Sequence, residues 1–111
     1  MFTDFLSDIF SNNREKDAII WQGRTYSYRF LLKTFREWMK QLAESSVSAN
    51  DVVLLEADFS PNAVALLLAL IEHSCIVVPL TASVKAKKEE FCEIAQVENI
   101  ITIDQEDAVS F

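Results

Sequence analysis

The sequence predicts an α/β fold: an N-terminal helix and a small β-hairpin, followed by a βαβαβ unit with a three-strand parallel sheet and flanking helices. Three observations lead to this prediction. Residues 51–80 read as strand, loop, helix and strand, which is the order of a parallel crossover. Residues 63–71 are apolar without interruption, which is typical of a helix buried on more than one side. Residues 99–103 add another short strand pattern after a further helical segment.

The first elements expected are a short helix and a hairpin. The helix begins after Thr3, which is placed to cap it, and ends near Asn12. Its apolar side chains recur on one helical side: Phe5, Leu6, Ile9 and Phe10. Residues 18–22 and 25–27 then read as two strands, and the single glycine of the chain, Gly23, lies in the turn between them.

A long amphipathic helix is expected next, over residues 28–45, with Ser27 as its cap. Apolar residues at spacings of three and four form one stripe along this segment. Residues 52–57 follow as a central strand, because their apolar run is continuous. Asp58 or Ser60 is placed to cap the apolar helix over 61–72, and Pro61 suits its first turn.

The last elements expected are a strand over 76–80, a helix over 84–96 capped by Ser83, and a strand over 99–103. The acidic residues after Asp104 are expected to be frayed. In this arrangement the strand 99–103 has no partner on its far side, and the apolar helix has no solvated face. The sequence therefore predicts that residues 1–111 form a single partial domain, covered by the remainder of a larger protein or by a second copy in a homodimer.

Composition and charge exclude several function classes. The formal net charge is −7, so no nucleic-acid partner is expected. Lys85, Lys87 and Lys88 form the only basic cluster, and they read as the polar face of a helix. The N-terminus has acids where a signal peptide needs bases, and the run 63–71 is too short for a membrane span. We expect a cytoplasmic protein in which Cys75 and Cys92 are free, buried thiols.

No catalytic, cofactor-binding or metal-ligating residue is predicted in this chain. The single histidine, His73, has no nucleophile arranged beside it in the sequence, and one glycine cannot build a glycine-rich phosphate loop. No spacing of metal ligands is present. The N-terminal carboxylates read as a solvated acidic surface: Asp4, Asp8, Glu15 and Asp17.

Four short segments give the sequence a resemblance to a family. They are Thr25-Tyr26-Ser27-Tyr28 before the long helix, Asn50-Asp51-Val52-Val53, Ser60-Pro61, and Val78-Pro79-Leu80. In this order the chain resembles the opening of the AMP-dependent synthetases and ligases, which include acyl-CoA synthetases, aryl-CoA ligases, luciferases and peptide-synthetase adenylation domains. The resemblance runs over roughly residues 18–103.

The chain also departs from that family. Three positions at which the family usually has glycine hold Ser46, Asn50 and Ser74, and its usual turn asparagine falls at Phe59. Asparagine adopts a left-handed backbone at low cost, whereas serine does so less readily. We therefore expect the loops at Ser46 and Ser74 either to differ from the family or to carry strain.

The resemblance implies a scaffold fragment of an ATP-dependent carboxylic acid:CoA or thiol ligase that forms an acyl-AMP intermediate. ATP and Mg²⁺ are implied for the full-length parent and none for this chain, which would itself be inactive. CoA or a carrier protein is implied as the parent's acyl acceptor. The alternative is a short stand-alone α/β module for interaction or assembly. A flavodoxin-like binding domain is disfavoured, because no acidic cluster or phosphate loop follows the predicted strands.

Overall fold

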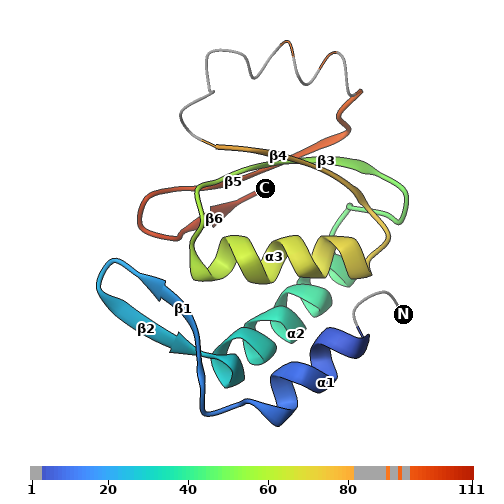
Figure 1. Cartoon of the computed structure of the whole chain (residues 1–111). Helices are drawn as coiled ribbons and strands as arrows, with labels where there is room; N and C mark the ends of the chain where they lie inside the picture. The colour runs from blue at the N-terminus through green and yellow to red at the C-terminus, as the bar shows by residue number, and fades with distance from the viewer. Residues whose placement is uncertain (1–3, 82–89, 91–92, 94–95) are drawn as a thin grey trace.

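The computed structural model describes residues 4–81, 90, 93 and 96–111, in three helices and six strands (Figure 1). Helix α1 (Asp4–Asn12) is followed by the strands β1 (Asp17–Trp21) and β2 (Arg24–Ser27) and by helix α2 (Tyr28–Glu44). Strand β3 (Val52–Glu56), helix α3 (Pro61–Glu72) and strand β4 (Ile76–Leu80) come next, before β5 (Asn99–Ile103) and β6 (Val109–Ser110). The expected helix 84–96, the cap at Thr3, Lys85, Lys87, Lys88 and Cys92 lie outside the described residues.

Local chemistry explains the hairpin and the start of α2. Gln22 and Gly23 both have positive φ values, 50° and 75°, as a two-residue turn between twisted antiparallel strands requires. The turn sets Trp21 opposite Arg24 and Ile20 opposite Thr25. The Phe30 N–H donates to Ser27 Oγ at 3.2 Å, so Ser27 is the cap of α2, as predicted.

The larger sheet has four strands in the order β4-β3-β5-β6. Strands β4, β3 and β5 are parallel, and Leu54 of β3 lies opposite Val78 on one side and Ile100 on the other. The predicted three-strand parallel unit is confirmed within the described residues. The expectation that β5 lacks a further partner is wrong, because β6 pairs with it antiparallel through Thr102–Ser110 and Ile103–Val109. The residues after Asp104 are therefore folded rather than frayed.

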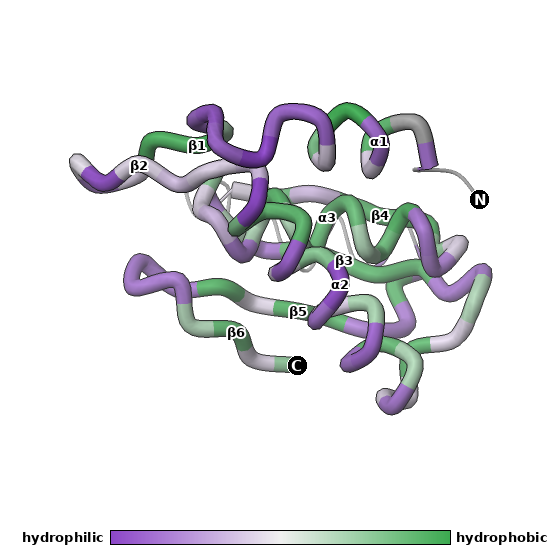
Figure 2. The backbone as a smooth tube through the Cα atoms, turned by 90° about the horizontal axis from the view of Figure 1, so that it is seen from below, coloured by the Kyte–Doolittle hydropathy of each residue, from purple (hydrophilic) through white to green (hydrophobic). Residues whose placement is uncertain are grey.

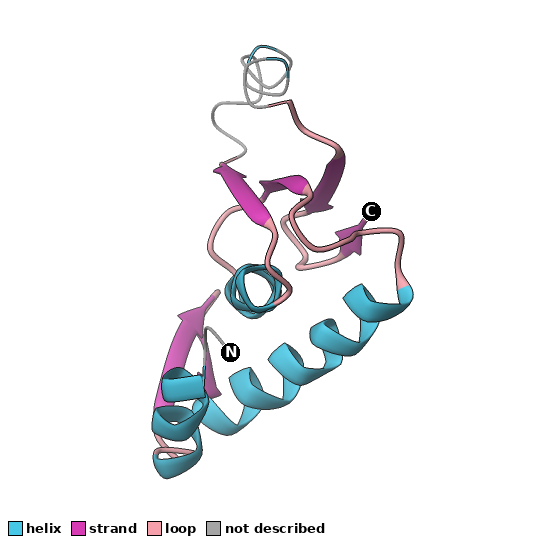
Figure 3. Cartoon of the chain, turned by 90° about the vertical axis from the view of Figure 1, so that its right-hand side faces the viewer, coloured by secondary structure: helices cyan, strands magenta, loops and turns pink. Residues whose placement is uncertain are grey.

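Helix α3 lies between the sheet and α2, as the end-on view in Figure 3 shows. Ala65, Leu66, Ala69 and Leu70 are fully buried in this layer. Figure 2 shows apolar colour along α3 and the neighbouring strand β3, and also on stretches of α1, β1 and β5. The prediction that α3 has no solvated face is only partly right: Leu67 and Leu68 are half-buried and Ile71 is 40% exposed. Within this chain, α2 and the sheet together cover most of the helix.

The end of α3 explains one of the departures from glycine. The Cys75 N–H donates to the Leu70 carbonyl at 3.0 Å and the Ser74 N–H donates to the Ile71 carbonyl at 3.1 Å. This pair of bonds is a Schellman motif. The residue that follows the C-cap in this motif, here Ser74, has a left-handed backbone and is usually glycine. Ser74 has φ +68° and Asn50, its neighbour across the strand edge, has φ +71°. The loop at Ser74 has therefore kept the backbone that glycine favours, at the cost of strain.

Candidate functional site: the carboxyl edge of the sheet

Open α/β sheets bind ligands outside the carboxyl ends of their parallel strands, so this edge is the first place to search. In this chain the edge is formed by the ends of β4, β3 and β5 and by the first turn of α3. A cavity of about 490 Å³ lies there between the hairpin and the sheet. The hairpin contributes Trp21 and Gln22 to its wall, and Gln22 Nε2 donates to the Gln105 carbonyl at 3.0 Å.

The start of α3, beside this cavity, is already occupied by a side chain of the same chain. Ser60 is the cap: its Oγ accepts from the Ala63 N–H at 3.2 Å and donates to Asp107 Oδ1. The Asn62 N–H lies 3.2 Å from Asp107 Oδ2, and Asn62 Nδ2 donates to the Asp107 carbonyl at 2.9 Å. A carboxylate thus lies at the positive end of the helix dipole. Asp107 holds the place that a phosphate would take at a helix start.

The charged groups that line the cavity are all acidic, and its other polar residues include Thr102 and Gln105. Glu56, Asp58 and Asp104 line it, and Glu56 is buried to 7% exposure. Among the described residues, no group of three or more histidine, cysteine or acidic side chains is arranged to hold a metal ion. The arrangement offers neither a phosphate cradle nor cations for a nucleotide. The residues that line this edge therefore do not fit ATP and Mg²⁺.

His73 and Cys75 lie at the opposite end of α3 and form no catalytic pair. His73 Nε2 is 2.9 Å from the Val47 carbonyl, so the ring joins the helix end to the loop before β3. Cys75 is free and half-buried, and its Sγ lies 3.6 Å from the Ser48 carbonyl. Burial raises the pKa of the Cys75 thiol, and the nearby Asp51 carboxylate raises it further. A raised pKa is the reverse of what an activated nucleophile needs.

A second cavity at the same edge is apolar. It has a volume of about 300 Å³ and lies between the ends of β3 and β4 and the first turns of α3. Phe59, which is 81% exposed, lies at its wall together with Leu67 and Pro79. This cavity holds the most exposed of the large hydrophobic side chains in the described part of the chain and is lined by no ionisable group other than Asp58.

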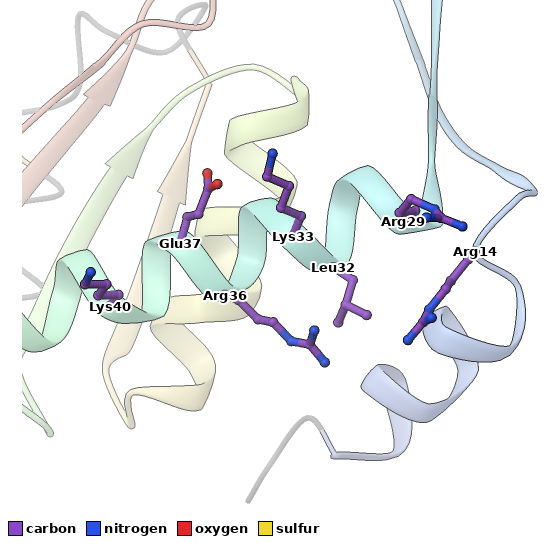
Figure 4. Close-up of a pocket in the computed structure, with 7 residues that line it drawn as sticks. All are labelled: Arg14, Arg29, Leu32, Lys33, Arg36, Glu37 and Lys40. Carbon is purple, nitrogen blue, oxygen red and sulfur yellow. The ribbon is translucent and has the colours of Figure 1, made fainter.

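A basic surface that the sequence pattern did not predict lies elsewhere, between α1 and α2. Five cations line a cavity of about 480 Å³ there: Arg14, Arg29, Lys33, Arg36 and Lys40. We call this surface the basic groove (Figure 4). The prediction that Lys85, Lys87 and Lys88 form the only basic cluster is therefore wrong. The groove is assembled from one residue after α1 and four residues spread over three turns of α2, so no run of basic letters reveals it.

Comparison with solved structures defines the class of fold. The N-terminal subdomain of NpsA from Klebsiella oxytoca matches 87% of this chain with a TM-score of 0.77 and 22% identity. An artificially fused adenylation–PCP di-domain, NpsA-ThdA from the same organism, matches 96% with a TM-score of 0.79 and 21% identity. IdnL1 matches 90% with a TM-score of 0.79 and 27% identity. No protein-family model and no curated protein matches the chain.

The chain has the fold found within the N-terminal subdomain of an adenylation domain. The resemblance to the opening of the adenylate-forming ligases is thereby confirmed at the level of the fold. The chain spans only 27%, 21% and 20% of the lengths of these three structures. In the part of the chain that the structure describes, none of the helices combines the length and apolar character needed to cross a bilayer.

Proposed function

We propose that this chain is a framework part of an adenylate-forming ligase. The parent enzyme would use ATP and Mg²⁺ to convert a carboxylic acid to an acyl-AMP, and would pass the acyl group to a thiol of CoA or of a carrier protein. A cytoplasmic location belongs to the same proposal. The observation that carries it is the shared fold over 87–96% of the chain with NpsA and its carrier-protein fusion.

The residues on which the family resemblance depends cap helices or end strands in this fold, and this supports a framework role. Ser27 caps α2, Ser60 caps α3, and Pro61 fills the first helical position of α3. Val78, Pro79 and Leu80 end strand β4, beside the carboxyl end of β3. None of these residues brings a nucleophile, a base or a phosphate donor set to the carboxyl edge. The chemistry of the parent would then come from residues outside this chain.

Pyrophosphate exchange tests the proposal directly. The 111-residue chain, incubated with ATP, Mg²⁺ and a panel of aliphatic and aromatic acids, is expected to give exchange at the level of a no-enzyme control. Exchange clearly above that control would contradict the framework role. The reading frame gives the second test: a continuation past Phe111 into a Ser/Thr/Gly-rich loop would support the ligase role.

The alternative is a stand-alone interaction module. It is favoured by large apolar side chains left open on the described surface, among them Ile20 at 76% and Phe59 at 81% exposure. The same surface would serve as the contact with the remainder of a ligase. A natural stop codon after Phe111, together with a stable complex of the chain with another protein, would favour the module.

A further inference from the structure

The basic groove concentrates the positive charge of an acidic protein on one surface. The chain has ten lysines and arginines and a net charge of −7, and five of the ten line this one groove. Arg29, Lys33, Arg36 and Lys40 recur at spacings of four, three and four, so they form one stripe along α2. Such a stripe in a chain rich in carboxylates is open to a ligand of opposite charge.

Side-chain geometry makes the groove more than a row of surface cations. Figure 4 shows Arg14 and Arg36 extending into the space between α1 and α2, with Leu32 between them. Leu32 is only 3% exposed, so the floor of the groove is firmly packed. Lys33 and the acidic Glu37 also line the groove but point to the other side of α2 in this view, away from Arg14 and Arg36. The guanidinium groups thus converge above an apolar floor, from two elements separated along the chain.

Most of these cations have no acidic partner. Arg29 forms an ion pair with Glu15, both largely exposed. Among the residues that the structure describes, no ion pair involves Arg14, Lys33, Arg36 or Lys40. Like charges at spacings of three and four destabilise a helix, and α2 has three such neighbouring pairs along its stripe, offset in part by Glu37, which lies four residues after Lys33 and three before Lys40. A bound anionic partner would relieve that repulsion.

We infer that the basic groove is a docking surface for an acidic helix of a partner protein. From Arg29 to Lys40 the stripe runs eleven residues, or about 17 Å along the axis of α2. A helix with carboxylates at spacings of three and four presents them at the same intervals as the cations of α2. A single phosphate would engage only one or two of these cations. This inference does not depend on the proposed ligase role.

Two other polyanions fit less well. A nucleic acid carries its charge far beyond 17 Å, so its flanks would meet the carboxylates that dominate the rest of this chain. Among the described helices of a second copy, α1 carries only Asp4 and Asp8, and Asp4 already has an interaction of its own. An acidic helix is short enough to match the groove and dense enough in charge to engage all of it.

Fluorescence anisotropy with a defined probe tests the inference. The probe is a fluorescein-labelled, alanine-based peptide of about 20 residues with glutamates at spacings of three and four. We expect saturable binding that weakens steeply with added salt, and no binding of the same peptide with glutamine in place of glutamate. Equal binding of the two peptides would overturn the inference. So would tighter binding of an oligothymidylate with the same number of charges.

A matched pair of variants locates the site. Arg36→Glu reverses a charge inside the groove and should raise the Kd for the acidic peptide about tenfold. Arg24→Glu reverses the same charge at the hairpin, outside the residues that line the groove, and should change the Kd less than about twofold. Circular dichroism and thermal melting would establish that both variants are folded. Equal effects of the two variants would contradict docking in the groove.

Discussion

Ser74 is strained at a position where the fold demands a left-handed backbone. It lies at the middle of the Schellman motif that ends α3, and its φ of +68° is one that a residue with a β-carbon adopts at a cost. Ser46 stands at another position where the related family has glycine, but it is not among the left-handed residues. One substitution has thus been accommodated by strain, whereas the other lies in a loop that no longer needs glycine.

Replacing Ser74 by glycine should stabilise the protein. Ser74→Gly relieves the left-handed strain, and this gain should outweigh the freedom that glycine adds to the unfolded chain, for a net stabilisation of up to about 1 kcal/mol. Thermal melting should show a Tm higher by a few degrees. Ser46→Gly is the control, since it adds only unfolded-state freedom and should lower the Tm slightly. A lower Tm for Ser74→Gly would mean that the loop depends on the serine side chain.

The thiol of Cys75 should titrate at an unusually high pH. Burial and the Asp51 carboxylate raise its pKa above the ordinary value of 9.0, so the folded state holds the proton where the unfolded chain has lost it. That contribution to stability is complete below pH 9 and is lost as the pH rises through the folded pKa. In a Cys92→Ser background, the rate of reaction with a disulfide reagent should have a higher midpoint pH in buffer than in urea. Coinciding midpoints would contradict this prediction.

At the scale of elements, the sequence was sufficient for segments whose caps and periodicity agree. Ser27 caps α2 and Ser60 caps α3, and the side chain of each accepts a hydrogen bond from a helix N–H group. The spacing of apolar residues predicted the extent of α2. Strand β6 could not be predicted in this way, since two residues carry no periodic pattern and its pairing with β5 depends on a turn through Asp107. The acidic composition after Asp104 predicted a solvent-exposed, frayed segment. One of those acids, Asp107, instead forms hydrogen bonds with the start of α3.

The basic groove was missed for a related reason. Its cations are dispersed along α2 and are joined by Arg14, which comes close to Arg29 because the Arg29 N–H donates to the Arg14 carbonyl at 3.1 Å. A helical projection of residues 28–45 would have revealed the stripe of four, whereas the contribution of Arg14 requires the tertiary structure. The expectation that this chain holds no catalytic residue stays a prediction, because the fold does not test it.

The cap of α3 by Asp107 should matter to the stability of the whole edge. Asp107→Asn keeps a residue that tolerates φ +65° and removes the charge from the helix start, so we expect a loss of about 1 kcal/mol in the free energy of unfolding. Urea denaturation measures this loss. Glu106→Gln removes an exposed charge from the same turn and should have little effect. Equal values for the two variants would show that Asp107 acts only through the shape of the turn.

At the scale of the whole molecule, the structure removes most of the two reasons for expecting a homodimer, which were an uncovered apolar helix and an unpaired strand over 99–103. Helix α3 is largely covered by α2 and the sheet, and β5 is paired with β6. What is left open is the apolar cavity beside Phe59, together with separate side chains such as Ile20 and Ile76. A contact between two copies would therefore be expected at Phe59 rather than along α3. The homodimer stays a prediction, and its expected contact surface is now the one around Phe59.

Sedimentation across a concentration series tests this surface. We expect reversible association at high micromolar concentration, because burying Phe59 and the cavity beside it removes apolar area from water. Phe59→Ser should give a monomer at every concentration, and Ile20→Ser, which removes an apolar side chain of similar exposure from the hairpin, should not. A strictly monomeric wild-type chain at high micromolar concentration would rule the dimer out.

The hydrogen bonds between Asp107 and the start of α3 also bear on the order in which parts of the chain become stable during synthesis. Ser60 and Asn62 lie 47 and 45 residues before Asp107, so they leave the ribosome well before the carboxylate that completes their hydrogen bonds. Until then, the nascent chain holds an apolar helix whose first turn has only its serine cap. A translational pause or a truncation before residue 107 would leave an apolar helix with a weakened start. Asp107 thus completes the start of the most hydrophobic helix only after the whole of that helix has been synthesised.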